Sequence, residues 1–211
     1  MSIDASPEQP PRRLTDRKRQ AIVQAAIEAF RSQGFDATSM DRIAADAGVS
    51  KRTVYNHFPG KDALFAEILV QLWDKAAALT EQAYLPGRPL RTQLLALMRQ
   101  KLRMLEDEHF VGLARVAIAE AIHAPERARD MVARLGDKEE GLTRWISDAM
   151  ADGRLKKADP AFASYQLQSL MKGFAFWPQL TMGQPALTRA EQAQVAESAV
   201  DMFLAYYAKG E

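Results

Sequence analysis

The spacing of its apolar residues is the feature that most limits what this chain can fold into. In the stretch "IVQAAIEAF", apolar side chains recur every three or four residues, as on one stripe of a helix; they are Ile22, Ala25, Ala26, Ala29 and Phe30. No segment of the chain shows the sustained alternation that a half-buried strand needs. The sequence therefore predicts an all-α fold, with three small N-terminal helices followed by a larger helical bundle.

Turn-forming and capping residues divide the N-terminal part into these three helices. Thr38, with Asp41 three residues later, has the pattern of a capping box that begins the second helix. Gly48 ends that helix, because the turn needs a residue that tolerates positive φ. Ser50 is suited to cap the third helix, and the Pro-Gly pair at 59–60 stops it. A longer helix is expected from residue 61, and later helices are expected over 89–106, 108–123, 126–151, 160–181 and 188–208.

Charge is distributed unevenly along the chain. There are 28 Lys and Arg against 27 Asp and Glu in total, but residues 12–61 hold ten bases and five acids. This excess indicates a surface that meets a polyanion, although an ordinary solvated face is the alternative. The absence of cysteine excludes disulfides, thiolate nucleophiles and cysteine-ligated metals. Because no apolar signal-peptide core or membrane-length segment is present, we expect a cytoplasmic protein.

The third predicted helix is polar on one side. At 100° per residue, Val54 and Phe58 point one way, and Arg52 and Asn56 point the opposite way. Two short helices joined by a glycine-containing turn, the second polar outside, form the helix-turn-helix pattern that enters the major groove of DNA. In that groove an arginine pairs with guanine and an asparagine with adenine, while Thr53 can meet the methyl group of thymine.

The run "ATSMDRIAADAGVSKRTVYNHFPGKDALF" closely resembles the DNA-binding domain of the tetracycline-repressor (TetR) family, and "IVQAAIEAFRSQGF" is similar to that family's first helix. This resemblance covers residues 14–66 in detail. It implies a homodimeric DNA-binding regulator, usually a repressor, whose divergent C-terminal domain binds a small effector. We accordingly divide the chain into a disordered basic arm (1–13), a helix-turn-helix DNA-binding domain (14–60) and a helical effector-binding and dimerisation domain (61–211).

The resemblance also implies which residues touch DNA. Ser39 resembles a phosphate or base contact near the start of the second helix. Many relatives carry a small residue where Arg52 stands and an aromatic one where Asn56 stands, so the operator sequence does not follow from kinship. The recognition-helix contact positions are occupied by Lys51, Arg52, Thr53, Tyr55 and Asn56, and the backbone anchors by His57 and Lys61.

Large apolar residues concentrate between residues 94 and 182. Each one alone is best explained as ordinary core, but Met and Trp are also suited to adaptable apolar pockets. Together with the resemblance, this favours a cavity for an apolar or aromatic effector, with Arg103, Arg115 or His123 as candidates to orient its polar end. The candidate lining residues are Met98, Leu102, Leu105, Phe110, Leu113, Trp145, Met171, Phe174 and Trp177.

The last two long helices carry apolar residues on more than one face. One stripe can therefore pack on the bundle while another meets a partner, and a two-fold dimer would match a palindromic operator. The alternative is an internal helix that is buried all round. The candidate dimer-interface residues are Phe162, Leu170, Val195, Ala199, Met202, Phe203 and Tyr206.

A helical-bundle metal or small-molecule-binding enzyme without DNA binding is the competing hypothesis. Glu106 with His109, and Glu120 with His123, have the Glu-x-x-His spacing of di-iron bundles. On one continuous helix the two histidines lie about 21 Å apart, too far to share a metal pair. The chain also lacks phosphate-loop and nucleophile-elbow motifs, so we predict no enzyme, no cofactor and no bound metal. The expected partners are a double-stranded DNA operator, a small apolar or aromatic effector and a second copy of the chain, with no membrane.

Overall fold

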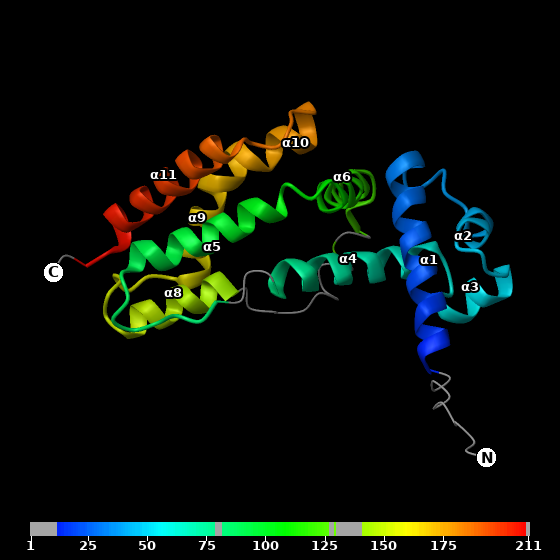
Figure 1. The fold of residues 1–211 in the computed structure, drawn as a ribbon, viewed down its shortest axis with the longest axis horizontal. Helices are drawn as coiled ribbons and strands as arrows, with labels where there is room; N and C mark the ends of the chain where they lie inside the picture. Colours follow the sequence, from blue (N-terminus) through cyan, green and yellow to red (C-terminus); the bar gives the residue numbers. More distant parts are fainter. Residues whose placement is uncertain (1–11, 79–81, 127–128, 130–140, 210–211) are drawn as a thin grey trace, which may run out of the picture. The chain divides into compact units, whose positions relative to one another are not determined.

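The computed structural model describes residues 12–78, 82–126, 129 and 141–209, which fold into α-helices joined by turns (Figure 1). The prediction of an all-α chain is confirmed. Within these ranges, extended pairing is limited to one isolated antiparallel bridge between Leu155 and Ala208. The helices are α1 (Arg12–Gln33), α2 (Met40–Asp46), α3 (Lys51–His57), α4 (Lys61–Ala78), α5 (Leu90–Met104), α6 (Glu108–His123), α8 (Gly141–Ala151), α9 (Pro160–Ala175), α10 (Trp177–Met182) and α11 (Arg189–Tyr207).

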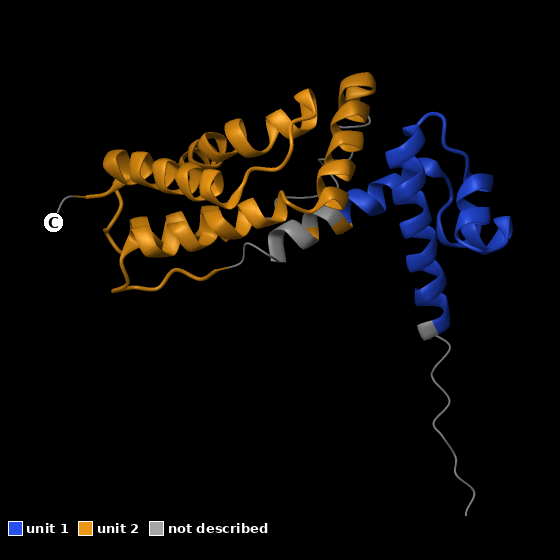
Figure 2. Ribbon diagram, turned by 45° about the horizontal axis from the view of Figure 1, so that its top comes forward, with its two compact units in different colours: residues 1–70 blue, residues 71–211 orange. Residues whose placement is uncertain are grey.

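The chain forms two compact units that divide between Val70 and Gln71 (Figure 2). The functional boundary that we expected after residue 60 stays a prediction. The compact N-terminal unit extends beyond that residue, because the first part of α4 contributes Leu64, Phe65 and Ile68 to the buried interior. The N-terminal unit therefore contains the start of α4 in addition to the three short helices.

Three phenylalanine rings join α4 to α1 within the first unit. The ring centroids lie 5.3 Å apart between Phe30 and Phe35, 5.6 Å between Phe30 and Phe65, and 5.1 Å between Phe35 and Phe65. Ring pairs at these distances stabilise a core beyond the burial of their area. Because Phe30 lies near the end of α1, the cluster fixes that end against the start of α4.

Two further boundaries differ from those expected. α1 begins at Arg12, so Arg12 and Arg13, which we assigned to a disordered arm, are its first two residues. Residues 1–11 of the expected arm lie outside the described part of the chain. The helix expected over 126–151 is described as α8 from Gly141 onward, and residues 127–128 and 130–140 lie outside the described part.

The single helix expected over 160–181 is two helices in the structure. α9 ends at Ala175 and α10 begins at Trp177. The cause is Pro178, which has no N–H for the carbonyl of residue 174 and whose ring would clash with that carbonyl in a continuous helix. α10 then ends at Met182 and is followed by its cap Gly183, whose φ of 64° favours glycine.

The second unit is built around α5, which runs beside α11, while α9 packs against both α8 and α11 (Figure 1). The buried amide of Gln93 on α5 ties the segment before that helix to α8. Its Oε1 accepts hydrogen bonds from the backbone N–H of Leu85 at 2.9 Å and the indole N–H of Trp145 at 3.3 Å. Its Nε2 donates to the carbonyls of Leu85 and Arg88. All four hydrogen-bonding positions of the amide are used, which compensates for its burial.

Candidate nucleic-acid interface

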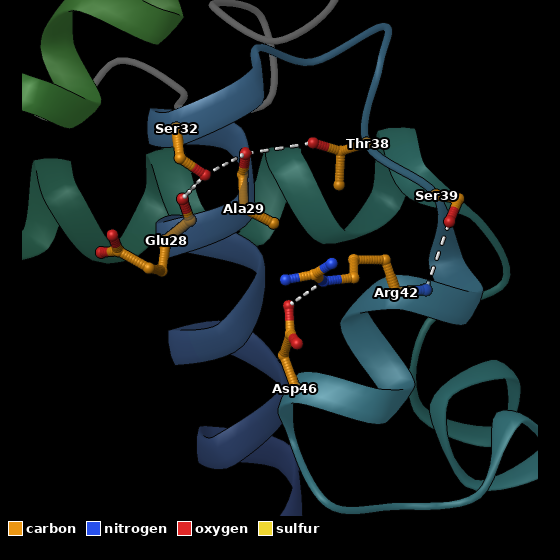
Figure 3. A network of polar contacts seen from close by, with 7 residues as sticks. All are labelled: Glu28, Ala29, Ser32, Thr38, Ser39, Arg42 and Asp46. Carbon is orange, nitrogen blue, oxygen red and sulfur yellow. Dashed lines mark hydrogen bonds and ion pairs between the residues drawn. The ribbon is translucent and has the colours of Figure 1, made fainter.

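Ser39 determines where α2 begins (Figure 3). Its Oγ accepts a hydrogen bond from the backbone N–H of Arg42 at 3.2 Å, which satisfies one of the free donors at the start of the helix. The Arg42 side chain reaches Asp46 one turn later, with Nε 2.8 Å from Oδ2. We expected Thr38 to be this cap, but the cap in the structure is the next residue, Ser39.

Thr38 instead fastens α2 to the end of α1 (Figure 3). Only 3% of the residue is exposed, and its hydroxyl lies 2.7 Å from the carbonyl oxygen of Gly34 and 3.2 Å from that of Ala29. The capping box that we predicted is wrong, because the cap of α2 is Ser39 and the Thr38 hydroxyl donates to carbonyl oxygens at the end of α1. Thr38 thereby sets the position of the neighbouring Ser39.

The turn between α2 and α3 has the geometry that its residues predicted. Gly48 has a φ of 64°, and the N–H of Val49 donates to the carbonyl of Ala44 at 3.0 Å. Ser50 caps α3 and accepts from the N–H of Thr53 at 3.1 Å. The structure confirms a helix-turn-helix at this position.

The two sides of α3 differ in the way that the sequence predicted. Val54 and Phe58 are buried, whereas Arg52, Tyr55 and Asn56 are exposed. A helix of seven residues is not stable alone, so the packing of its buried side holds it in place. The exposed side leaves an arginine and an asparagine available for base edges. Contact with DNA stays a prediction for the candidate residues Ser39, Lys51, Arg52, Thr53, Tyr55, Asn56 and His57.

Lys51 is already engaged within the helix-turn-helix. Its Nζ lies 2.8 Å from Oδ1 of Asp41 on α2, and both side chains are exposed. The hydrogen bond and the charge of that carboxylate raise the pKa of Lys51 above its ordinary value. A DNA phosphate that binds this ammonium must therefore compete with Asp41 or share it.

Lys61 binds inside the N-terminal unit. Its Nζ donates to the carbonyl of Phe35 at 2.6 Å and to that of Asp36 at 3.0 Å, and it lies 4.5 Å from the centroid of the Phe35 ring. An ammonium has three donors, so at most one is left for a phosphate. In this structure the residue that we expected to anchor DNA joins the start of α4 to the turn after α1.

Arg19 is a positioning residue that the sequence did not reveal. Its guanidinium pairs with Glu67 of α4 at 2.8 Å and lies 5.1 Å from the ring centroid of Phe58, which ends α3. One α1 side chain therefore contacts both α4 and the residue that closes the candidate recognition helix. Arg19 sits in the basic run "RKR", and nothing in the sequence distinguishes it from its exposed neighbours Arg17 and Lys18.

The candidate effector residues separate into two groups. Phe174 and Trp177 are 65% and 45% exposed, and their place in an effector pocket stays a prediction. Both lie where α9 gives way to α10, so the break at this point leaves them at the surface. The other seven are buried in the second unit: Met98, Leu102, Leu105, Phe110, Leu113, Trp145 and Met171.

The candidate dimer residues also separate. Ala199 and Phe203 are buried and belong to the core of the second unit, and their part in a dimer interface stays a prediction. Leu170 and Val195 are half-buried. The exposed members are Phe162 on α9 and Met202 and Tyr206 on α11. Tyr165, which we did not predict, is also exposed, on α9.

Two apolar hollows flank the side chains of Leu170 and Met202 on α9 and α11. One has a volume of about 520 Å³ and is lined by Phe162, Tyr165 and Tyr206 among others. The second has a volume of about 530 Å³ and contains Phe174 and Val195 in its lining. These hollows lie at the surface of the helix pair, apart from the buried candidates for the effector site.

The structure does not bring together a metal centre from the two Glu-x-x-His pairs, within the residues that it describes. Glu120 is buried whereas His123 is exposed, and Glu106 accepts a hydrogen bond from the amide of Gln192 at 2.7 Å. Among the described residues, no three His, Asp or Glu side chains lie close enough together to hold a metal ion. A helix long and apolar enough to cross a membrane is likewise not found in the described segments.

An N-terminal unit that presents the polar side of a short helix after a glycine turn defines a DNA-binding protein of the helix-turn-helix class. Residues 22–68 match the family described as "Bacterial regulatory proteins, tetR family", and residues 92–209 match "AefR-like transcriptional repressor, C-terminal domain". The chain belongs to the TetR family of transcriptional regulators.

Individual relatives agree with this assignment. A TetR-family regulator of known structure from Pseudomonas syringae pv. tomato is 50% identical, with 93% of this chain and 99% of that chain covered and a TM-score of 0.81. The structure named Flavonoid-responsive Regulator FrrA is 30% identical, with 93% of this chain and 100% of FrrA covered and a TM-score of 0.75. The regulator RutR of Escherichia coli (strain K12) is 28% identical over 185 residues, which are 85% of this chain and 84% of RutR.

Proposed function

We propose that this regulator is a homodimeric repressor that binds a palindromic operator and is released from it by a small apolar or aromatic effector. The observation that carries the DNA-binding part is the division of α3. Buried Val54 and Phe58 hold the helix, and exposed Arg52 and Asn56 offer the bidentate groups that read guanine and adenine. Lys51 and exposed basic residues of α1 supply the sequence-independent attraction to phosphates.

The exposed faces of α9 and α11 support the dimer. Phe162, Tyr165, Met202 and Tyr206 place large apolar area in water, next to two apolar hollows. A second copy of the chain would cover this area in a two-fold arrangement, in which each side uses the same residues. Two recognition helices about 34–36 Å apart would then read two half-sites one turn of DNA apart.

The buried side chains of the second unit support an effector site. Met98, Trp145 and Met171 provide large, polarizable apolar surface, and methionine adapts its shape to a ligand. The 30% identical relative FrrA is named as flavonoid-responsive, and a flavonoid is an aromatic molecule. The effector releases DNA only if it binds more tightly to the conformation that does not fit the operator.

Selection of duplexes from random DNA by the purified full-length protein tests this function. We expect enrichment of a palindromic site that is bound by a dimer, and a loss of enrichment when a cognate aromatic compound is added. If no duplex is preferred over random competitor at low salt, the proposal that the protein binds a specific operator is contradicted. A helical-bundle enzyme without DNA binding would then become the better hypothesis.

A further inference from the structure

The two ends of α3 are held in different ways. At its start, the hydroxyl of Ser50 accepts a hydrogen bond from the N–H of Thr53. Lys51 also pairs there with Asp41 of α2. At its other end the helix is capped by Phe58, which is 3% exposed. The position of the C-terminal end of α3 therefore depends on what packs against this buried ring.

Arg19 of α1 lies over the ring of Phe58. Its guanidinium carbon is 5.1 Å from the ring centroid, and its Nη2 is 2.8 Å from Oε2 of Glu67 on α4. The side chains of Arg19 and Glu67 are 37% and 25% exposed, so the pair is partly shielded from water. A guanidinium is planar and can stack on a ring while its N–H groups bond a carboxylate. Glu67 therefore orients the cation that lies on the end of α3.

The value of this contact lies in position more than in stability. A partly exposed ion pair adds little to the free energy of folding. A helix of seven residues is not stable alone, however, and groups that read a ligand must be held within about 0.5 Å and 10–20° of their productive geometry. Asn56 lies two residues before Phe58, whereas Arg52 lies about one turn earlier, near the end that Ser50 caps. A shift of the C-terminal end would displace Asn56 more than Arg52.

We infer that Arg19 and Glu67 are positioning residues for base recognition at the C-terminal end of α3. Glu67 orients Arg19, and Arg19 holds the ring of Phe58. The ring in turn fixes the end of the helix from which Asn56 reads its base. This inference rests on the proposed function, since it names residues that set the specificity of that same DNA site.

Glu67→Met tests the inference because charge and positioning predict opposite signs. Loss of a carboxylate makes the unit more positive, so charge alone predicts tighter binding of every duplex. An Arg19 released to contact a phosphate predicts the same. Positioning predicts weaker binding of the selected operator. At the base pair that Asn56→Ala identifies, we expect discrimination to fall about tenfold, and at the Arg52 base pair to change less than about twofold. Fluorescence anisotropy with singly substituted duplexes measures both.

Matched variants separate the pair from the rest of the unit. Glu28→Met removes the same charge from an exposed glutamate of α1, which pairs with Arg31 of its own helix, and should keep both discriminations. Arg19→Lys keeps the charge but lacks the planar group, and should lose discrimination as Glu67→Met does. In an Arg19→Met background, Glu67→Met should cause no further loss. Thermal unfolding verifies that each variant is folded, and Glu67→Gln replaces Glu67→Met if the methionine variant does not fold.

Hydrogen exchange of the full-length protein without DNA gives a second readout. The N–H of Phe58 donates to the carbonyl of Val54 at 2.9 Å. In Glu67→Met this N–H should exchange about tenfold faster, because the end of α3 opens more often. The N–H of Thr53, bonded to Ser50 at the other end, should change less than about twofold, and the control variant should change neither rate. Exchange followed by NMR resolves the two amides.

The two readouts keep the inference distinct from the operator test. An unchanged exchange rate at Phe58 overturns the inference, as does a loss of discrimination that is absent or equal at the two base pairs. A preferred duplex together with either result would leave the regulator in place and remove the role of Glu67. Faster exchange at Phe58 without any preferred duplex would support the positioning of α3 and contradict the proposed operator binding.

Discussion

Lys51 of α3 and Asp41 of α2 form an ion pair across the helix-turn-helix, with Nζ 2.8 Å from Oδ1. Both side chains are exposed, so the pair adds little to the stability of the unit. Its consequence concerns DNA: the ammonium at the start of the candidate recognition helix is held by a carboxylate, and that carboxylate also repels a phosphate at the same position.

Asp41→Asn should therefore tighten DNA binding several-fold at low salt, for operator and random duplex alike. The variant releases Lys51 for a phosphate. The slope of log K against log salt should therefore become steeper by the amount that corresponds to about one additional phosphate contact. Fluorescence anisotropy over a salt series measures both quantities. Asp36→Asn is the control, because it removes the same charge while the contact of residue 36 with Lys61 uses the backbone carbonyl. Equal effects of the two variants on DNA affinity would mean that the ion pair between Lys51 and Asp41 does not limit DNA binding.

Arg52→Ala and Asn56→Ala should each relax the preference at one base pair per half-site. We expect a loss of about 1–3 kcal/mol for the preferred base and little loss for the others. Binding of a duplex panel with single substitutions in the selected operator measures this discrimination. Lys18→Ala, at an exposed position on α1, should instead weaken all duplexes equally. A uniform loss from Arg52→Ala would assign this arginine to the DNA backbone.

Thr38→Val should destabilise the protein by about 1–3 kcal/mol. The variant keeps the shape of the buried side chain but removes the hydroxyl that donates to the carbonyls of Gly34 and Ala29. Urea unfolding followed by circular dichroism gives the free energy. Thr38→Ser keeps the hydroxyl and should lose much less. Equal stability of Thr38→Val and the parent protein would show that these hydrogen bonds contribute nothing.

The fold of the N-terminal unit follows from local signals in the sequence. Gly48 needs its positive φ, Ser50 caps α3, and the spacing of Val54 and Phe58 separates the buried side from the exposed one. These features depend on residues within one or two turns of each other. This is why the sequence predicted them, and why it predicted the position of the candidate DNA-facing helix as well.

Longer-range contacts could not be predicted in the same way. Lys61 reaches carbonyls 25 and 26 residues before it, and Arg19 reaches a residue of α4, so their partners depend on how helices pack. The buried contact between Lys101 and Gln168 had one visible signal in the sequence, a cation on the apolar stripe of α5 between Met98 and Leu102. Gln168 lies 67 residues away from Lys101, and only the packed bundle brings the two together.

Met202→Asp should convert the proposed homodimer into a monomer and weaken operator binding. The exposed side chain lies between the two apolar hollows, so a charge at this point would be buried without a partner in a two-fold interface. Sedimentation velocity measures the mass, and anisotropy measures the affinity. Ile122→Asp places the same charge at another exposed apolar position, on α6, and should stay dimeric. A dimeric Met202→Asp would put the interface elsewhere.

Glu191 should make the stability of the second unit depend on acid pH. The hydroxyl and the backbone N–H of Thr188 donate to its carboxylate at 2.7 and 2.8 Å, and these hydrogen bonds lower its pKa below the ordinary value of 4.5. A carboxyl whose pKa is lowered by folding adds stability that is complete above the unfolded pKa and disappears as pH falls through the folded one. The gap in Tm between the parent and Glu191→Gln should therefore be constant near neutral pH and shrink below about pH 4.5. The exposed Glu126→Gln should show no such trend. A gap that widens on acidification would contradict the role assigned to the hydrogen bonds between Thr188 and Glu191, which form a capping box at the start of α11.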